Sequence, residues 1–456
     1  MTVTTINPAT EEVIKDYSLM SRKEVMVILD YVHKAFVGWK TLPVQQRASY
    51  FAKVARVLRN NKEKYAQLIT QEMGKPVTEA RAEIEKCVWT AEIYAENGER
   101  WLQEQVLKAD GKEHRVVYQP LGVIFSIMPW NFPFWQAFRF GIPTLLAGNA
   151  SLLKHASNVT GCALAIEDVF KEAGFPENVF RTVIADHDSV AEIVASNHIA
   201  GVSLTGSTSA GKRIGELAGK NLKKVVLELG GSDPFIVLED ADLDKTAEQA
   251  TVGRFLNCGQ SCVAAKRFIV VESVAEDFAR KFAKDVKQKV LGNPVEESTR
   301  LGPLVSKKAV EQIEDQVNDA VDKGATILTG GKRAKDKGYF YEPTILVNTT
   351  KEMKVVKEEV FGPVAPIIVV ADEEDAVKVA NATEFGLGGS VWTKDIERGK
   401  RIARQLECGC AFVNSFVKSD PRIPFGGIKK SGIGRELSKY GLREFVNVKA
   451  INVYEP

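Results

Sequence analysis

A strand-to-helix turn stands out at Gly201-Val-Ser-Leu-Thr-Gly-Ser-Thr-Ser-Ala-Gly-Lys-Arg213. The apolar run Gly201–Thr205 predicts a short buried strand, and the helical spacing of Ala210–Lys220 predicts the helix that follows. The turn nearly matches the phosphate-binding pattern Gly-x-x-x-x-Gly-Lys-Ser/Thr, but Arg213 replaces the hydroxyl that would hold Mg²⁺, so nucleotide hydrolysis lacks a ligand. Glycine and hydroxyl residues before a helix still form an anion site, which suits a cofactor pyrophosphate.

Strand-like and helix-like stretches alternate on both sides of this turn. One series extends from about residue 121 to residue 230, and a second from Pro234 to Val413. Because such alternation is typical of parallel sheets with crossover helices, we predict two α/β units that meet near residue 230. Residues 22–105 predict helices, since apolar residues recur there at helical spacing. In the second series a helix is predicted over residues 274–290, with Ser273 as its N-cap.

The composition is that of an ordinary globular protein. Of the 456 residues, 45% are hydrophobic and 26% are charged, and the formal net charge is only +2. A net charge this close to zero does not indicate binding to nucleic acid or to an anionic membrane. The N-terminus lacks the pattern of a signal peptide, and no uninterrupted apolar run approaches the ~18 residues of a membrane span. We therefore expect a cytoplasmic protein with no nucleic-acid partner and no membrane partner.

Cysteine and histidine usage argues against a disulfide framework and against a zinc site. Six cysteines are spread over a long chain, and the five histidines stand singly. The close cysteine pairs have the spacings Cys-x-x-x-Cys and Cys-x-Cys, and neither pair lies near a histidine cluster. No metal site is expected.

The sharpest candidate for chemistry is Asn257-Cys-Gly-Gln-Ser-Cys262. A cysteine that follows a glycine-containing loop can face a cleft, where backbone N–H groups stabilise a thiolate or an oxyanion. An arbitrary cysteine is more often buried and inert. This stretch alone leaves both interpretations open.

Two further stretches carry polar groups in apolar surroundings. In Leu227-Glu-Leu-Gly-Gly231, partial burial of Glu228 would raise its pKa, as a general base for water requires; a surface glutamate at a strand end is the alternative. In Pro129-Trp-Asn-Phe-Pro133, the amide of Asn131 could donate to a developing oxyanion or could cap a helix.

Taken in order, these stretches resemble the aldehyde dehydrogenase superfamily. The match extends essentially from end to end, from Asn7-Pro-Ala-Thr to Pro424-Phe-Gly-Gly. The motifs in register between them are Pro-Trp-Asn131-Phe-Pro, Lys154, Thr205-Gly-Ser-Thr, Glu228-Leu-Gly-Gly, Gly-Gln-Ser-Cys262 and Glu359-Val-Phe361-Gly-Pro. Six motifs in the same order make a chance match very improbable.

The resemblance implies a role for each matching residue. Cys262 matches the nucleophile, Glu228 the base that activates the deacylating water, and Asn131, with the backbone N–H of Cys262, the oxyanion hole. The cofactor contacts that it implies come from Trp130, Lys154, Ser157, Gly206, Ser207, Glu359 and Phe361. The implied reaction oxidises an aldehyde to its acid through a thioester on Cys262, with hydride transfer to a nicotinamide. Glu228 argues against relatives that acylate coenzyme A, because these typically lack the base.

The resemblance also implies the fold, an α/β architecture in three parts. A Rossmann-like cofactor-binding domain would take residues 1–101 and 121–230, and an α/β catalytic domain would take residues 231–431. A small β oligomerisation element, built from residues 102–120 and 432–456, would present an edge strand that seeks a partner. We therefore expect a homodimer or homotetramer.

Within the superfamily the chain is most similar to bacterial-type succinate semialdehyde dehydrogenases. The stretches that carry this similarity are Asn131–Arg139, Leu153-Lys-His-Ala156 and Ser419-Asp420. The substrate-binding residues that it implies are Trp135, Arg139, Ser261 and Ser419. A guanidinium in an apolar tunnel would suit a distal carboxylate, unless Arg139 pairs with a carboxylate at a subunit interface. Leu256 departs from the pattern, because some semialdehyde dehydrogenases carry a second arginine there.

Ser157 bears on the choice of cofactor. NAD-preferring relatives often have a glutamate at this position, whose charge repels a 2′-phosphate. A serine removes the repulsion and can bind the phosphate beside Lys154. We expect NADP, with NAD as the alternative.

Three alternatives stay open. The substrate could be a neutral or aromatic aldehyde, and the chain could be a non-catalytic nucleotide-binding or structural protein on the same fold. The complete set of Asn131, Glu228 and Cys262 argues against the second of these. A reversible disulfide between Cys258 and Cys262 would require their Cα atoms to lie within about 7 Å.

Overall fold

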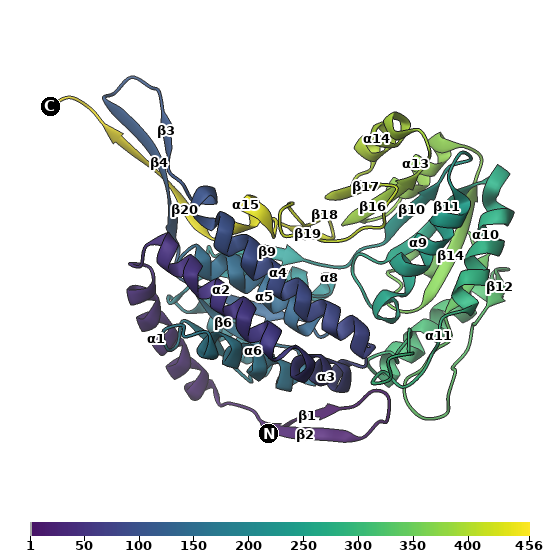
Figure 1. The fold of residues 1–456 in the computed structure, drawn as a ribbon, viewed down its shortest axis with the longest axis horizontal. Helices are drawn as coiled ribbons and strands as arrows, with labels where there is room; N and C mark the ends of the chain where they lie inside the picture. The colour runs from purple at the N-terminus through teal and green to yellow at the C-terminus, as the bar shows by residue number, and fades with distance from the viewer. Residues whose placement is uncertain (1) are drawn as a thin grey trace.

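The computed structural model describes residues 2–456 as two α/β units and a projecting β arm. In Figure 1 the first unit lies on the left and the second on the right, and the arm extends from the first unit to the C-terminus. Over residues 2–456, none of the helices combines the length and the apolar composition that a bilayer span requires.

The first unit contains a six-stranded sheet with the order β19-β9-β8-β5-β6-β7. Its strands are β5 (Val123–Met128), β6 (Ala150–His155), β7 (Phe180–Thr182), β8 (Ile199–Thr205), β9 (Lys224–Glu228) and β19 (Gly432–Ile433). The first five are parallel, and β19 is antiparallel to β9. Every residue of β6 is buried, because helices cover both faces of the sheet, and this explains its continuous apolar run.

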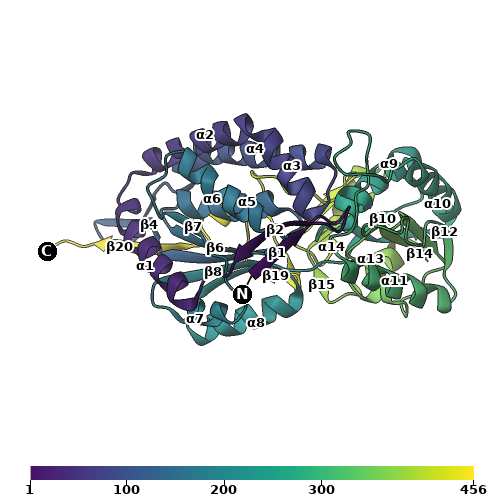
Figure 2. The same ribbon diagram turned by 90° about the horizontal axis from the view of Figure 1, so that it is seen from below.

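The two helical layers of this unit are visible in Figure 2, with the sheet between them. One layer consists of α2 (Val44–Asn60), α3 (Lys62–Met73), α4 (Val77–Trp101), α5 (Pro133–Leu146) and α6 (Thr160–Glu172). The other consists of α1 (Arg22–Trp39), α7 (Ser189–Ala195) and α8 (Thr208–Lys220). The smaller elements are the hairpin β1 (Thr2–Ile6) and β2 (Val13–Ser18), the 3₁₀ turn η1 (Ser157–Val159) and α15 (Ser438–Leu442). The sequence analysis does not predict the hairpin.

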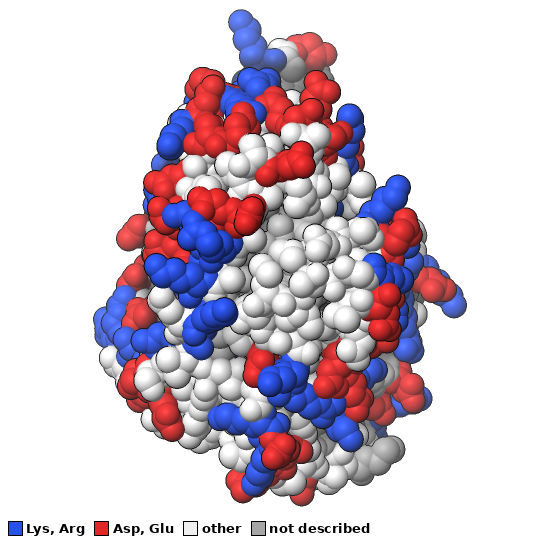
Figure 3. Space-filling model, turned by 90° about the vertical axis from the view of Figure 1, so that its right-hand side faces the viewer, with Lys and Arg blue, Asp and Glu red and all other residues white. Residues whose placement is uncertain are grey.

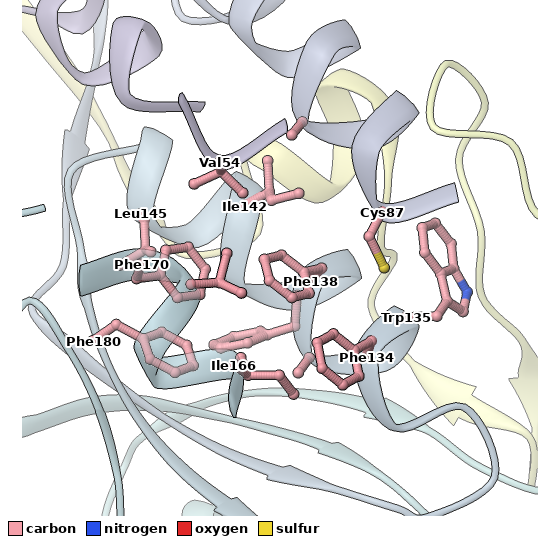
Figure 4. Close-up of a cluster of buried hydrophobic side chains, with 14 of the residues drawn as sticks. Val54, Cys87, Phe134, Trp135, Phe138, Ile142, Leu145, Ile166, Phe170 and Phe180 are labelled. Atoms are coloured by element: carbon pink, nitrogen blue, oxygen red, sulfur yellow. The ribbon is translucent and has the colours of Figure 1, made fainter. Parts of the chain in front are cut away.

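Helix α5 is the rigid centre of the first unit, since all of its residues are buried. Phe134 and Phe138 stack with ring centroids 6.2 Å apart, and Phe138 stacks on Phe170 at 5.2 Å. Figure 4 shows this aromatic cluster, with Trp135 at its edge beside Cys87 of α4. The packing fixes the rotation of α5 about its axis, and therefore fixes where its remaining side chains point.

The second unit contains a seven-stranded sheet with the order β12-β13-β14-β11-β10-β16-β17. Its strands are β10 (Asp233–Val237), β11 (Ala265–Val271), β12 (Thr326–Thr329), β13 (Thr344–Val347), β14 (Val364–Val370), β16 (Gly388–Trp392) and β17 (Cys410–Val413). Its helices are α9 (Leu243–Phe255), α10 (Glu272–Lys287), α11 (Lys307–Asp322), α12 (Lys354–Lys357), α13 (Glu373–Asn381) and α14 (Ile396–Gln405). The 3₁₀ turn η2 (Leu256–Gly259) follows α9, and β15 (Phe385–Gly386) pairs with β18 (Ile428–Lys429).

The prediction that Ser273 caps a helix is wrong. Helix α10 begins at Glu272, directly after β11, so Ser273 lies in its first turn. The N-cap position belongs to Val271, which has no side-chain acceptor and makes no capping hydrogen bond. By contrast, α9 and α11 are capped by the side chains of Asp242 and Ser306, which accept from the backbone N–H groups of Lys245 and Ala309.

The arm is a three-stranded sheet with the order β20-β4-β3. Its strands are β3 (Gln105–Leu107), β4 (Glu113–Pro120) and β20 (Val446–Val453), and β20 pairs antiparallel with the whole of β4. After Val446 every residue of β20 is exposed, and Val448 is 60% exposed. The outer edge of β20 therefore carries exposed apolar side chains and unpaired backbone groups.

The charged surface is mixed. Figure 3 shows one end of the molecule, where both signs surround a central uncharged area and neither sign covers the whole face. Within residues 2–456, no group of three or more His, Cys, Asp and Glu side chains is arranged to hold a metal ion.

Candidate active site

Two cavities meet at Cys262. One has a volume of about 300 Å³ and is lined by residues of α4, α5 and the loop after β17; the other has a volume of about 370 Å³ and lies at the carboxyl edge of the first sheet. We call them the α4–α5 cavity and the sheet-edge cavity. Among the described residues, Cys262 alone lines both. A nucleophile in this place can face one ligand on each side.

The loop that carries Cys262 is built from unusual backbone. Asn257 and Cys258 have φ angles of 55° and 54°, and Gly259 has 72°, so three successive residues are left-handed. A Cβ on Gly259 would lie 2.3 Å from the carbonyl oxygen of Gly362, so this position requires glycine. The loop therefore turns sharply against the segment that contains Glu359.

Arg254 holds these two segments together. Its fully buried guanidinium donates to the carbonyl oxygens of Gly259 at 3.1 Å, Ala265 at 3.1 Å and Val360 at 3.2 Å, and also to that of Gly362. Because every acceptor is a backbone carbonyl, Arg254 fixes the course of the chain on both sides of Cys262.

The amide of Asn131 is oriented by its neighbours. Gln136 Nε2 donates to Asn131 Oδ1 at 3.0 Å, and Asn131 Nδ2 donates to the carbonyl oxygen of Gln260 at 3.0 Å. Asn257 Nδ2 in turn donates to the Asn131 carbonyl at 2.7 Å. The Nδ2 group therefore faces the Cys262 loop, and its second hydrogen stays available to an oxyanion.

The thiol of Cys262 is protonated at neutral pH in this structure. Burial raises its pKa to about 11, although the positive charges of Arg139 and Lys266 lower it. The negative charges of Glu228 and Glu359 raise it further. Formation of the thiolate therefore needs a base or a change in the surrounding charge.

Glu228 ends strand β9 and is buried, but it lines neither cavity. Both of its carboxylate oxygens lack a hydrogen-bond partner among the described residues. Burial raises its pKa well above the usual range, the negative charge of Glu436 adds to this, and Arg139 opposes it. The prediction of an elevated pKa for Glu228 agrees with this environment.

The sheet-edge cavity brings together residues from the ends of three strands and from the second unit. The predicted cofactor residues that line it are Trp130, Gly206, Ser207, Glu359 and Phe361, together with Asn131. Ser207 caps α8 and accepts from the backbone N–H of Ala210 at 3.3 Å. The rings of Trp130 and Phe361 meet edge to face at 5.8 Å. A crevice at the carboxyl edge of a parallel sheet is the usual place for a nucleotide in such folds.

Lys154 and Ser157, two of the predicted cofactor residues, do not line this cavity. Lys154 is the next-to-last residue of β6, and η1 begins at Ser157. Lys154 is buried, and within residues 2–456 its ammonium has neither a hydrogen bond nor an ion pair. Burial lowers its pKa, and Asp186 opposes this. An unpaired buried ammonium suits a phosphate group.

Glu359 already has partners on its carboxylate. It accepts from the backbone N–H of Gly231 at 3.1 Å and is ion-paired with Lys266 at 2.8 Å. The same ammonium donates to the carbonyl oxygen of Cys262 at 2.8 Å. Lys266, which was not predicted from the sequence, therefore connects the loop that contains Cys262 to the loop that contains Glu359.

The α4–α5 cavity contains the four predicted substrate residues, Trp135, Arg139, Ser261 and Ser419. Arg139, however, is not a free cation. Its guanidinium is ion-paired with Glu436, the two side chains are 3% and 5% exposed, and Nη2 donates to Thr205 Oγ1 at 3.2 Å. The alternative considered for Arg139 was a pairing with a carboxylate of another subunit, but the carboxylate that it contacts belongs to the same chain.

Two lysines that were not predicted from the sequence, the half-buried Lys86 and the exposed Lys418, also line this cavity. The position of Lys86 in a long helix gives no local signal of its role, and the residues that it contacts are distant in the sequence.

Cys258 lies in the buried core of the second unit, and both it and Cys262 are free thiols.

Comparisons with known proteins identify the family of this chain. The model of the aldehyde dehydrogenase family matches residues 1–451. The probable succinate-semialdehyde dehydrogenase (NADP⁺) of Synechocystis sp. is 44% identical, with 99% of each chain covered, and the succinate semialdehyde dehydrogenase (NAD(P)⁺) of Escherichia coli K12 is 43% identical, with 98% of this chain and 96% of that protein covered. The crystal structure of succinic semialdehyde dehydrogenase from Streptococcus pyogenes in complex with NADP⁺ superposes with a TM-score of 0.97 at 37% identity, covering 99% of this chain and 100% of that chain.

Proposed function

Because this chain belongs to the aldehyde dehydrogenase family, we propose that it oxidises succinate semialdehyde to succinate with NADP⁺ through a thioester on Cys262. The observation that carries the proposal is the place of Cys262 between two cavities. The α4–α5 cavity would hold the aldehyde, and the sheet-edge cavity would hold the nicotinamide end of the cofactor.

The nucleophilic step uses groups on both sides of the loop. The Cys262 thiolate adds to the aldehyde carbon, and the resulting oxyanion accepts hydrogen bonds from Asn131 Nδ2 and from the backbone N–H of Cys262. Loss of a hydride from this thiohemiacetal leaves a thioester. Arg139 and Lys266 favour the thiolate, because their charges lower the pKa of the thiol.

Glu228 is the proposed base for the second half-reaction. Its carboxylate takes a proton from water, the hydroxide attacks the thioester carbon, and succinate leaves as Cys262 is released. Since Glu228 lines neither cavity, its side chain must rotate toward Cys262 for this step.

The residues at the sheet edge fit a dinucleotide phosphate. Lys154 offers an ammonium that has no partner within residues 2–456, and Ser157 offers a hydroxyl at the start of η1 in place of a carboxylate that would repel a 2′-phosphate. Ser207, at the N-terminus of the 13-residue helix α8, is the proposed pyrophosphate contact. Bound NADP⁺ would supply the hydride acceptor for the oxidation. The relatives named for NADP⁺ and for NAD(P)⁺ support this preference.

We also propose that the chain forms a homodimer or homotetramer through the arm, in the three-part domain division expected from the sequence. The exposed edge of β20 supports this, because a second copy could pair with it. Residues 432–433 join the first sheet rather than the arm, so the arm's C-terminal contribution is β20.

Steady-state kinetics with succinate semialdehyde and butanal, each with NADP⁺ and NAD⁺, test the proposal. We expect the highest kcat/KM for succinate semialdehyde with NADP⁺. A preference for butanal would favour a neutral-aldehyde dehydrogenase, and inactivity with every aldehyde would favour a non-catalytic role.

A further inference from the structure

Lys86 lies in the wall of the α4–α5 cavity without a counter-charge. Its ammonium donates to Ser419 Oγ at 2.6 Å and lies 4.4 Å from the centre of the Trp135 ring. Lys86 and Ser419 are 333 positions apart in the sequence, so this contact joins α4 to the loop that follows β17. Within residues 2–456, no carboxylate forms an ion pair with Lys86.

The two carboxylates whose charges act on Lys86, those of Glu83 and Asp420, already have partners. Glu83 is ion-paired with Lys75 and accepts from the backbone N–H groups of Phe134 and Trp135, both at 2.9 Å. Asp420 is ion-paired with Arg422 at 2.6 Å. Burial lowers the pKa of Lys86 to about 8, and the positive charge of Arg139 lowers it too. A half-buried ammonium in this state gains stability from an anion that enters the cavity.

Arg139 has a different place. Its charge is balanced by Glu436, and it lies close enough to Cys262 to lower the pKa of the thiol. The charge of Arg139 therefore acts on the thiol of Cys262. Lys86 and Ser419 line the same cavity as Cys262, on the wall formed by α4 and the loop after β17.

We propose that Lys86 determines substrate specificity by binding the distal carboxylate of the aldehyde between its ammonium and Ser419 Oγ. This inference rests on the proposed function and deepens it. Trp135 stacks under the ammonium and fixes its position, while Leu256, Phe416 and Phe425 give the rest of the cavity an apolar wall. An unbranched aldehyde with a terminal carboxylate satisfies both the apolar wall and the Lys86 ammonium, whereas Lys418, the other lysine of the cavity, is exposed to solvent.

The test compares Lys86→Met and Lys86→Gln with Lys86→Arg in the full-length enzyme. The ratio of kcat/KM for succinate semialdehyde to kcat/KM for butanal should fall by about ten- to a hundredfold in Lys86→Met and Lys86→Gln, mainly through KM. Lys86→Gln keeps a hydrogen-bond donor near Ser419, so a lower kcat/KM ratio in this variant would result from the loss of the positive charge. Lys86→Arg keeps the charge and should restore most of the ratio. The Kd of succinate, measured by calorimetry, should rise in parallel.

Arg100→Met is the matched control. Arg100 lies on the same helix, is exposed, and donates only to Asn97, so the variant removes one positive charge from α4 without touching the cavity. Its ratio should equal that of the wild type. An unchanged ratio in both Lys86→Met and Lys86→Gln would overturn the proposal.

A second substrate pair separates this inference from the proposed function. The wild type could prefer butanal to succinate semialdehyde but glutarate semialdehyde to pentanal. If Lys86→Met then abolishes the preference for glutarate semialdehyde, the role of Lys86 is supported and succinate semialdehyde is rejected as the substrate. If the wild type prefers the neutral aldehyde in both pairs, both proposals fall.

Discussion

Arg139 and Glu436 form a buried ion pair, and Arg139 lines the α4–α5 cavity together with Cys262. Burial disfavours the charged guanidinium, but Glu436 and Glu228 outweigh this and raise the pKa of Arg139. The pair thus keeps a positive charge close to the thiol without leaving it unbalanced. It also ties α5 to a segment near the C-terminus.

This pairing predicts a large effect of Arg139→Met on stability. The substitution leaves Glu436 buried without a partner, and breaking a buried pair from one side typically costs about 3–5 kcal/mol. We expect a clear fall in Tm by calorimetry. The double variant Arg139→Met/Glu436→Gln should recover most of the fall; a double variant no more stable than the single one would show that Glu436 is not the group left uncompensated.

Cys262→Ala should abolish aldehyde oxidation while NADPH binding, followed by fluorescence titration, persists. In the proposed mechanism the acyl group is carried on this sulfur, and no other described residue lines both cavities. Cys258→Ala is the control, because Cys258 lies in the core of the second unit. If Cys258→Ala were the inactive variant, the nucleophile would have to be reassigned.

The raised pKa of Cys262 predicts a steep pH dependence of its alkylation in the free enzyme. Only the thiolate reacts, and the thiol pKa is about 11. The rate with iodoacetamide should therefore rise about tenfold per pH unit between pH 7 and pH 10, since the thiolate fraction rises in that proportion below the pKa. The Cys262→Ala variant gives the background from the other cysteines. A rate that levels off near pH 7 would contradict the prediction.

Glu228→Gln should separate the two half-reactions. The amide keeps the shape of the side chain but cannot take a proton from water. We expect a burst of NADPH equal to the enzyme concentration, followed by turnover slowed by about 10²–10⁴-fold, with an acyl adduct visible by mass spectrometry. Absence of both the burst and the adduct would place Glu228 before acylation, in the activation of the thiol.

Ser157→Glu should shift the cofactor preference toward NAD. A carboxylate placed against a 2′-phosphate beside Lys154 costs several kcal/mol, so the ratio of NADP⁺ to NAD⁺ kcat/KM should fall by at least about tenfold. Ser157→Ala removes the hydroxyl without adding charge and should have a smaller effect. An unchanged ratio in Ser157→Glu would show that residue 157 lies away from the ribose.

The local elements were predictable because their signals are local. The apolar runs at 150–154, 201–205 and 234–238 predict β6, β8 and β10 to within two residues of where they lie. The family match and the superposition confirm the predicted family and fold class. The capping error at Ser273 has a local cause too: a helix can start directly from a strand, without the polar cap that marks most helix starts.

The chemical environment was less predictable, because it depends on contacts between distant segments. Arg139 stands out in the sequence as a charge in an apolar stretch, but Glu436, which balances it, gives no signal that links it to Arg139. In the sequence Lys86 resembles the other charged residues of an amphipathic helix, and its contact with Ser419 forms only when the chain folds. Lys266 is similarly hidden at the start of β11 until the loop around Glu359 folds against it.

The late position of β19 in the chain has a consequence for synthesis on the ribosome. Strand β9 is complete by Glu228, but the strand that covers its outer edge comes roughly 200 residues later. At about 5–20 residues per second, that edge stays unpaired for roughly 10–40 s. Throughout this interval Arg139 also lacks Glu436, so the nascent first unit carries an open sheet edge and an unbalanced internal cation. We expect chaperones to bind such a nascent chain. The active site can form only after the last few dozen residues have emerged from the ribosome.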